Sequence, residues 1–146
     1  MSYRYGVAST SRLETCHEQI QVVFKRVIKY VDCSILEGHR SIERQTELYN
    51  TVLPDGSRLT KIDGISQKGN HNYDPSRAVD AIPYPGKLHG QSVWHDQPRL
   101  CLFAGIVLGI AFSEGVLMRW GGDWQSDGSP RNDTFFDGPH YELVGL

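Results

Sequence analysis

The chain has 146 residues, the length of one ordinary domain, so we expect residues 1–146 to fold as a single domain. Its formal net charge is −2 and no strongly basic run is present, which excludes the charge pattern typical of nucleic-acid or anionic-membrane binding. Three cysteines without a CxxC pair argue against a disulfide scaffold. The most apolar run, residues 102–112, is shorter than the roughly 20 residues of a membrane span.

Apolar residues at helical spacing predict an N-terminal helix over about residues 11–31. The stripe consists of Leu13, Cys16, Ile20, Val23, Val27 and Val31. Ser11 and Glu14 are spaced as in a capping box, which favours a helix start at this point. Residues 33–36 indicate a short strand, and residues 42–52 indicate a second helix.

The rest of the chain alternates irregularly between short strands and helices. We expect a turn at residues 54–57, loop structure up to residue 70, strands at 78–82, 116–120 and 141–144, a polar loop at 121–133, and an apolar helix at 97–115 that is buried on most sides. Such an order predicts an α+β fold rather than a doubly wound parallel sheet.

Two histidines and one aspartate are candidates for a metal site. Asp80 interrupts the apolar strand at residues 78–82, where an unpaired buried carboxylate would be costly. His71 precedes it by nine residues, and His140 lies just before the last strand. Catalytic zinc takes three such protein ligands and leaves a fourth position for water. Asp137, three residues before His140, would be the nearby carboxylate that accepts the proton of that water.

Four segments carry a resemblance to a known family. Residues 71–80 (HNYDPSRAVD) and 137–142 (DGPHYE) resemble the two metal motifs of the M15 zinc metallopeptidases, the D-alanyl-D-alanine carboxypeptidase and L-alanyl-D-glutamate endopeptidase group that includes phage endolysins. Residues 120–124 (WGGDW) resemble the tryptophan-glycine segment of that family, and residues 38–41 (GHRS) resemble the segment with an arginine near the substrate. The matching order and spacing cover about residues 30–146.

The resemblance implies both a fold and a chemistry. The fold would be a small α+β domain of the D,D-peptidase/Hedgehog-like type, with a short antiparallel sheet flanked by helices. Zn²⁺ would be held by His71, Asp80 and His140, and Asp137 would be the general base. Arg40 would bind or polarise the substrate near the scissile amide, because a guanidinium stabilises an oxyanion without needing a proton. The substrate would be the stem peptide of peptidoglycan.

Several residues near these motifs have expected supporting roles. Trp124, in a loop, and Gln45, one turn into the second predicted helix, are candidates for substrate contact. Glu142 shares a strand face with the second histidine and would orient it. Asp123 would organise its loop by accepting backbone hydrogen bonds, while Trp120 is expected to be a packing anchor.

Two specificities and one inactive alternative remain open at this stage. The first is an L-alanyl-D-glutamate endopeptidase acting as a phage endolysin, and the second is a D,D-carboxypeptidase or dipeptidase. The third is a non-catalytic zinc-binding or phage structural domain of the same fold. The N-terminus has no features of a secretory signal. We therefore expect the protein to be made in the host cytoplasm and to reach the wall through a pore formed by another protein. We also expect it to be a monomer.

Overall fold

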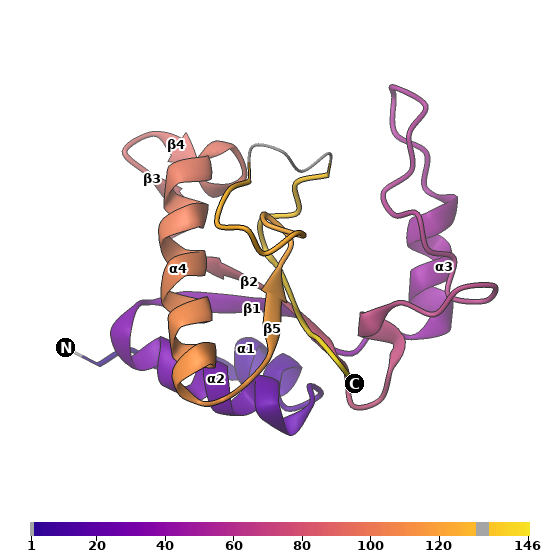
Figure 1. The fold of residues 1–146 in the computed structure, drawn as a ribbon. Helices are drawn as coiled ribbons and strands as arrows, with labels where there is room; N and C mark the ends of the chain where they lie inside the picture. Colours follow the sequence, from indigo (N-terminus) through magenta and orange to yellow (C-terminus); the bar gives the residue numbers. More distant parts are fainter. Residues whose placement is uncertain (1, 131–134) are drawn as a thin grey trace.

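The computed structural model describes residues 2–130 and 135–146 (Figure 1). The helices are α1 (Val7–Leu13), α2 (Glu18–Tyr30), α3 (Ile42–Asn50) and α4 (Gln97–Ser113), with 3₁₀ turns η1 (Asn70–Asn72) and η2 (Val93–His95). The strands are β1 (Cys33–Glu37), β2 (Ala78–Pro83), β3 (Lys87–Leu88), β4 (Gln91–Ser92), β5 (Met118–Trp120) and β6 (His140–Leu143). The predicted α+β class with an antiparallel sheet is confirmed.

A four-stranded antiparallel sheet in the order β1-β2-β6-β5 is the centre of the fold. Its two faces differ because side chains alternate along a strand. Asp80 of β2 lies opposite His140 of β6, so both project from the same face. The other face contributes the fully buried Val79, Ala81 and Tyr141 to the hydrophobic core. One face of the sheet therefore builds the core, and the other carries the candidate ligands.

Helices α2 and α4 cover the core face. Helix α4 packs against β2 and β5, and α2 packs against α4. Phe24 of α2 meets the Tyr141 ring edge-on, with centroids 5.7 Å apart. Figure 1 shows α3 on the opposite side of the sheet from α4, beside the loop of residues 51–69. The face of the sheet that carries the candidate ligands therefore lies on the side of α3.

Helix α4 is less buried than the sequence predicts. Leu102 is 70% exposed and Phe112 is 87% exposed, and Gly105 and Gly109 lie exposed on the same side. An outer-layer helix has the core on one side only, so an apolar sequence around the whole helix leaves one face uncovered. No helix in the described part of the chain is long and apolar enough to cross a membrane.

The predicted N-terminal helix is two helices, and its capping box is wrong. Helix α1 begins at Val7, after Gly6, whose N-cap position makes no side-chain hydrogen bond. Helix α2 begins after His17, whose Nδ1 accepts the N–H of Gln19 at 3.1 Å. Between them the chain leaves the helix because it binds Ser76 instead. The N–H of His17 donates to the Ser76 carbonyl at 2.8 Å, and the Ser76 N–H donates to the Thr15 carbonyl at 2.9 Å.

The other predicted elements are found with shifted ends. Helix α3 starts after Ser41, whose Oγ accepts the N–H of Arg44 at 3.1 Å, and it ends two residues before the predicted end. The predicted strands correspond to β1, β2, β5 and β6. The short β3–β4 hairpin and the two 3₁₀ turns were not predicted, because two or three residues carry too little periodicity to be recognised.

Candidate metal centre

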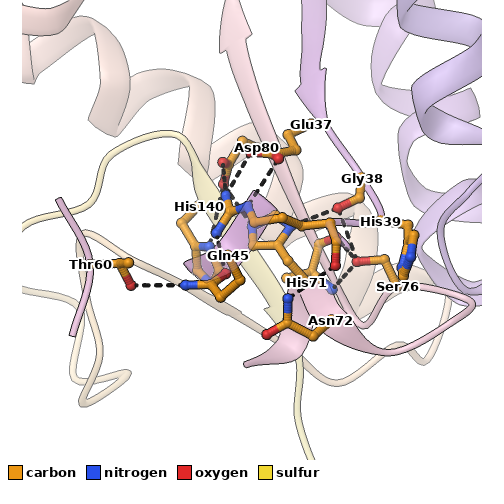
Figure 2. Close-up of polar contacts among 12 residues, drawn as sticks. Glu37, Gly38, His39, Gln45, Thr60, His71, Asn72, Ser76, Asp80 and His140 are labelled. Carbon is orange, nitrogen blue, oxygen red and sulfur yellow. Dashed lines mark hydrogen bonds and ion pairs between the residues drawn. The ribbon is translucent and has the colours of Figure 1, made fainter. Parts of the chain in front are cut away.

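His71, Asp80 and His140 come together as the sequence predicts, although they lie on three separate elements. His71 is on the 3₁₀ turn η1, Asp80 is in the middle of β2, and His140 begins β6. Asp80 Oδ1 lies 3.2 Å from His71 Nε2 and 3.3 Å from His140 Nδ1. Figure 2 shows the three side chains facing one another. Among the described residues they form a group whose ligand atoms all lie within 4.8 Å of one another.

These separations fit one small metal ion. Two ligand atoms about 2.0 Å from a tetrahedral zinc ion lie roughly 3.3 Å apart. The measured separations of 3.2 and 3.3 Å from Asp80 Oδ1 match this value. Two imidazole nitrogens and a carboxylate are also the donor set that zinc accepts in catalytic sites. The residues present therefore fit a divalent metal with an open position.

The orientation of His71 is set by the backbone. Its Nδ1 lies 2.8 Å from the Gly38 carbonyl, so that nitrogen carries the proton and Nε2 is left to face Asp80. Ser76 Oγ also donates to this carbonyl, at 3.3 Å. Gly38 has to be glycine, because a Cβ there would collide with the Thr15 side chain and the Arg12 carbonyl. The end of α1 thus fixes the partner that orients a candidate metal ligand.

A chain of two ion pairs orients His140. Its Nε2 lies 2.8 Å from Glu142 Oε1, and Glu142 Oε2 accepts from Arg119 Nη2 at 2.6 Å. Glu142 lies on the His140 face of β6, as predicted, and Arg119 is opposite it on β5. Burial alone would raise the pKa of Glu142, but the hydrogen bonds from His140 and Arg119 lower it to about 2. Glu142 therefore stays ionised and directs His140 Nδ1 toward Asp80.

The protonation of Asp80 and His140 reflects their mutual contact. Burial would raise the pKa of Asp80, but hydrogen bonds from His140 and His71 hold it far below its usual range. Burial would lower the pKa of His140, but Asp80 and Glu142 raise it to about 9. The carboxylate and the two imidazoles together therefore favour a bound positive charge, either a proton on His140 or a cation.

Asp137 lies on a tight turn directly before His140. Its N–H donates to the Gly121 carbonyl at 2.8 Å, and its carbonyl accepts the His140 N–H at 3.1 Å. Burial raises the pKa of Asp137 above the usual range of an aspartate, the charge of His140 counteracts this, and the nearby Asp80 carboxylate adds to it. A Cβ at Gly121 would collide with the Asp137 carbonyl, which explains the glycine after Trp120.

Arg40 lies beside Asp80, but its position differs from that of a free substrate-binding group. Its Nε and Nη2 donate to the two oxygens of Glu37, at 2.9 and 2.6 Å. Its Nη1 donates to Gln45 Oε1 at 2.9 Å, and Nη2 lies 3.7 Å from Asp80 Oδ2. The Arg40 side chain is only 13% exposed. The guanidinium is therefore fixed in the protein with one edge toward the candidate ligand.

Gln45 is not placed as a substrate contact, and this prediction needs correction. The side chain is 2% exposed, and its Nε2 donates to the Ile62 carbonyl at 2.7 Å and to Thr60 Oγ1 at 3.2 Å. With Oε1 accepting from Arg40, the amide has no free group to offer. Helical periodicity could place Gln45 on α3 but could not reveal that the 51–69 loop folds over it. Figure 2 shows it between Thr60 and the metal-site residues.

The loop after β5 is organised as predicted. Asp123 accepts two backbone N–H groups of its own loop, at 3.2 and 2.9 Å. The Trp124 ring lies 5.5 Å from the His140 ring, and its Nε1 donates to the Phe135 carbonyl at 2.6 Å. Trp120 is 5% exposed, as expected of a packing anchor. Part of the predicted polar loop, residues 131–133, lies outside the described residues.

Sequence reasoning missed four residues that support the centre. They are Glu37, which pairs with Arg40; Asn72, whose Nδ2 donates to the Arg40 carbonyl at 3.0 Å; Ser76; and Arg119. Asn72 and Ser76 stand inside the first metal motif, so proximity to His71 was a usable signal. Glu37 and Arg119 gave none, because their contacts depend on strand pairing.

Comparison with known proteins places the chain. The family model described as "Phage L-alanyl-D-glutamate peptidase" matches residues 1–144. Among solved structures, the crystal structure of the Serratia marcescens L-Ala D-Glu endopeptidase ChiX is similar, with a TM-score of 0.66 and 26% sequence identity. The match covers 97% of this chain and 90% of that one. No curated protein matches the chain. With a family match over nearly its whole length, the chain belongs to the phage L-alanyl-D-glutamate peptidases, which are peptidoglycan hydrolases.

Proposed function

We propose that this peptidase is a zinc enzyme whose metal is held by His71, Asp80 and His140. The observation that supports the proposal most is the pair of 3.2 and 3.3 Å separations around Asp80 Oδ1, with the outer ring nitrogen of each histidine held by the Gly38 carbonyl or by Glu142. Zinc bound there would act as a Lewis acid and lower the pKa of a water molecule toward neutrality. Family membership favours the L-alanyl-D-glutamate bond over a D,D-carboxypeptidase specificity.

Asp137 is the proposed general base. It is half-buried next to His140, and burial raises its pKa, which brings it closer to the range useful for proton transfer near neutral pH. It would take the proton of the attacking water and return it to the leaving amine of D-glutamate. An inactive zinc-binding domain would have no use for a buried carboxylate at this place, so Asp137 favours an enzyme over that alternative.

Arg40 is the proposed electrostatic partner of the scissile amide. Its guanidinium remains charged at any pH at which the protein is folded, and the contacts to Glu37 and Gln45 hold it without substrate. A fixed positive group costs no reorganisation when negative charge develops on the carbonyl oxygen. Trp124 retains its proposed role as a stacking surface for the stem peptide, since its ring borders His140.

The remaining proposals concern the whole molecule. The three ligands, the base and Arg40 come from one chain, which supports a monomer of one domain as the active unit. We also propose that the enzyme acts on the wall of its host after passing a pore made by another protein, in the manner of an endolysin. Size-exclusion chromatography with light scattering tests the first proposal, and lysis assays with and without a pore-forming partner test the second.

A digest of purified peptidoglycan tests the proposed function. The protein is stripped with a chelator, assayed, and assayed again after zinc is added. We expect no cleavage without metal, and cleavage with zinc that gives fragments with a new D-glutamate amino terminus by mass spectrometry. Full activity in excess chelator would overturn the zinc proposal, and a different new amino terminus would overturn the bond assignment. Asp137→Ala that binds zinc and cleaves normally would remove the role given to Asp137.

A further inference from the structure

A β-bulge in β1 turns Glu37 toward the metal centre. Ile35 lies opposite Ala81 and Glu37 lies opposite Asp80, so Leu36 is an extra residue without a partner. With regular alternation Glu37 would share the face of Ile35, which is fully buried in the core. Residues directly opposite each other in an antiparallel pair project from the same face. The bulge therefore moves a carboxylate from the core face to the face of Asp80.

Glu37 and Gln45 hold Arg40 from two sides. Glu37 forms a bidentate ion pair with Nε and Nη2, at 2.9 and 2.6 Å, and Gln45 accepts from Nη1 at 2.9 Å. Gln45 is itself anchored by its bonds to Thr60 and Ile62. A bidentate arginine–carboxylate pair defines the plane of the guanidinium as well as its distance. Arg40 thus has little freedom to swing.

The distance at which Arg40 is held from Asp80 matters because Asp80 is a candidate metal ligand. Arg40 Nη2 stops 3.7 Å from Asp80 Oδ2, whereas a direct charge-assisted hydrogen bond is about 2.7–2.9 Å long. An unrestrained guanidinium would close this gap and compete with a cation for the carboxylate. Restrained, it contributes its charge to the site without occupying the ligand.

We propose that Glu37 is a positioning residue that keeps Arg40 beside Asp80 but off it, and thereby protects the metal site. The inference rests on the proposed zinc site. It assigns Glu37 a function through Arg40, not through contact with substrate. Loss of Glu37 then weakens zinc binding only when Arg40 is present, because the released guanidinium competes with zinc for Asp80.

A double-mutant cycle tests this mechanism with zinc affinity as the readout. Zinc is titrated against a chromogenic chelator in the wild type, Glu37→Gln, Arg40→Met and the double variant. We expect Glu37→Gln to bind zinc about tenfold more weakly, at the lower end of the effect of residues that support metal ligands. Arg40→Met keeps or raises the affinity. The double variant stays within about twofold of Arg40→Met, because the competing guanidinium is gone.

Glu43→Gln is the matched control. Glu43 is exposed on α3, six residues after Glu37. The substitution removes the same charge without touching Arg40, so zinc affinity should stay unchanged. Thermal unfolding of each variant checks that it folds. If Glu37→Gln does not fold, Glu37→Asp serves instead, because it keeps the charge and shortens the reach to Arg40, and a lower zinc affinity is again expected.

The outcomes separate the possible explanations. An equal loss of affinity with and without Arg40 would mean that Glu37 acts only through its charge across space, and would overturn the proposal. An unchanged affinity in Glu37→Gln would overturn it as well. A wild-type protein that binds no zinc would overturn the proposed function, and the inference with it, which distinguishes that failure from the other two.

Discussion

Zinc binding by the metal-free protein is expected to release a proton from His140. Burial would lower the pKa of this histidine, but Asp80 on one side and Glu142 on the other raise it to about 9. At neutral pH the metal-free protein therefore holds a proton on the imidazole. The nitrogen that faces Asp80 needs a free lone pair to bind a metal, so the ion has to displace that proton.

The size of the effect follows from the pKa of His140. Below pH 9, displacement of one proton raises the apparent zinc affinity about tenfold for each pH unit, or about a hundredfold from pH 6 to pH 8. The same shift affects the stability of the metal-free protein. A rise from 6.5 to about 9 corresponds to about 3 kcal/mol. Because the folded-state pKa is raised, this stability is fully present below pH 6.5 and is lost as the pH rises through 9.

Calorimetric titration provides the assay. Zinc is added to chelator-treated protein at pH 6, 7 and 8, each in two buffers with different ionisation enthalpies. We expect a difference in heat that corresponds to about one proton released per zinc ion at pH 7. The His89→Gln variant, which removes an exposed histidine, should give the same result. Equal heats in both buffers, or an affinity that does not change between pH 6 and 8, would refute this account of the site.

Three further predictions address single residues. Asp137→Asn should lower kcat/KM about 10²–10⁴-fold with little change in zinc affinity. The control Asp55→Asn, in an exposed turn, should leave both quantities unchanged. In the wild type, the acid limb of the pH profile of kcat/KM should lie above the usual aspartate pKa of about 3.9, because the pKa of Asp137 is raised. Glu142→Gln should weaken zinc binding about 10–100-fold, measured by chelator competition, because His140 loses its ionised partner; an unchanged affinity would contradict the orienting role. Gly121→Ala should lower the free energy of unfolding by about 1–3 kcal/mol in urea titrations, because the added Cβ meets the Asp137 carbonyl; Gly86→Ala, where a Cβ has open space, should be nearly neutral.

Much of the candidate centre could be predicted from sequence because its candidate ligands stand in local motifs. Asp80 was visible as a charge inside an apolar strand, and His140 as a histidine directly before the last strand. Both positions follow from strand alternation, which is a property of neighbouring residues. The contact between Glu142 and His140 could be expected for the same reason, since the two residues are separated by one position on β6, and the orienting role of Glu142 stays a prediction.

The contacts that escaped prediction depend on pairing between distant segments. Regular alternation places Glu37 on the core face, and only the bulge opposite Asp80 reverses this. Gln45 was expected to contact substrate because the path of the loop from Thr60 to Ile62, which covers it, is not encoded by any periodicity. The helix break before His17 has a similar origin, since the segment gives up helical bonds to pair with Ser76, about sixty positions along the chain.

The charges around the centre explain why distant residues such as Glu37 and Arg119 bear on metal binding. The carboxylates of the centre are Asp80, Asp137, Glu142 and Glu37, and the guanidinium groups are Arg40 and Arg119. With neutral histidines and ionised carboxylates, four negative groups and two positive groups leave a net charge of −2. A partly buried charge of this size is costly unless it is balanced, and one divalent cation balances it.

In the metal-free protein the proton on His140 supplies part of the missing charge, which is the reason for its raised pKa. Removing Glu37 would release Arg40 toward Asp80, and removing Arg119 would take away one of the groups that keep Glu142 ionised. In the proposed zinc site, affinity is therefore expected to depend on this whole charge-balanced set, of which the three proposed ligands are only the part that would touch the ion.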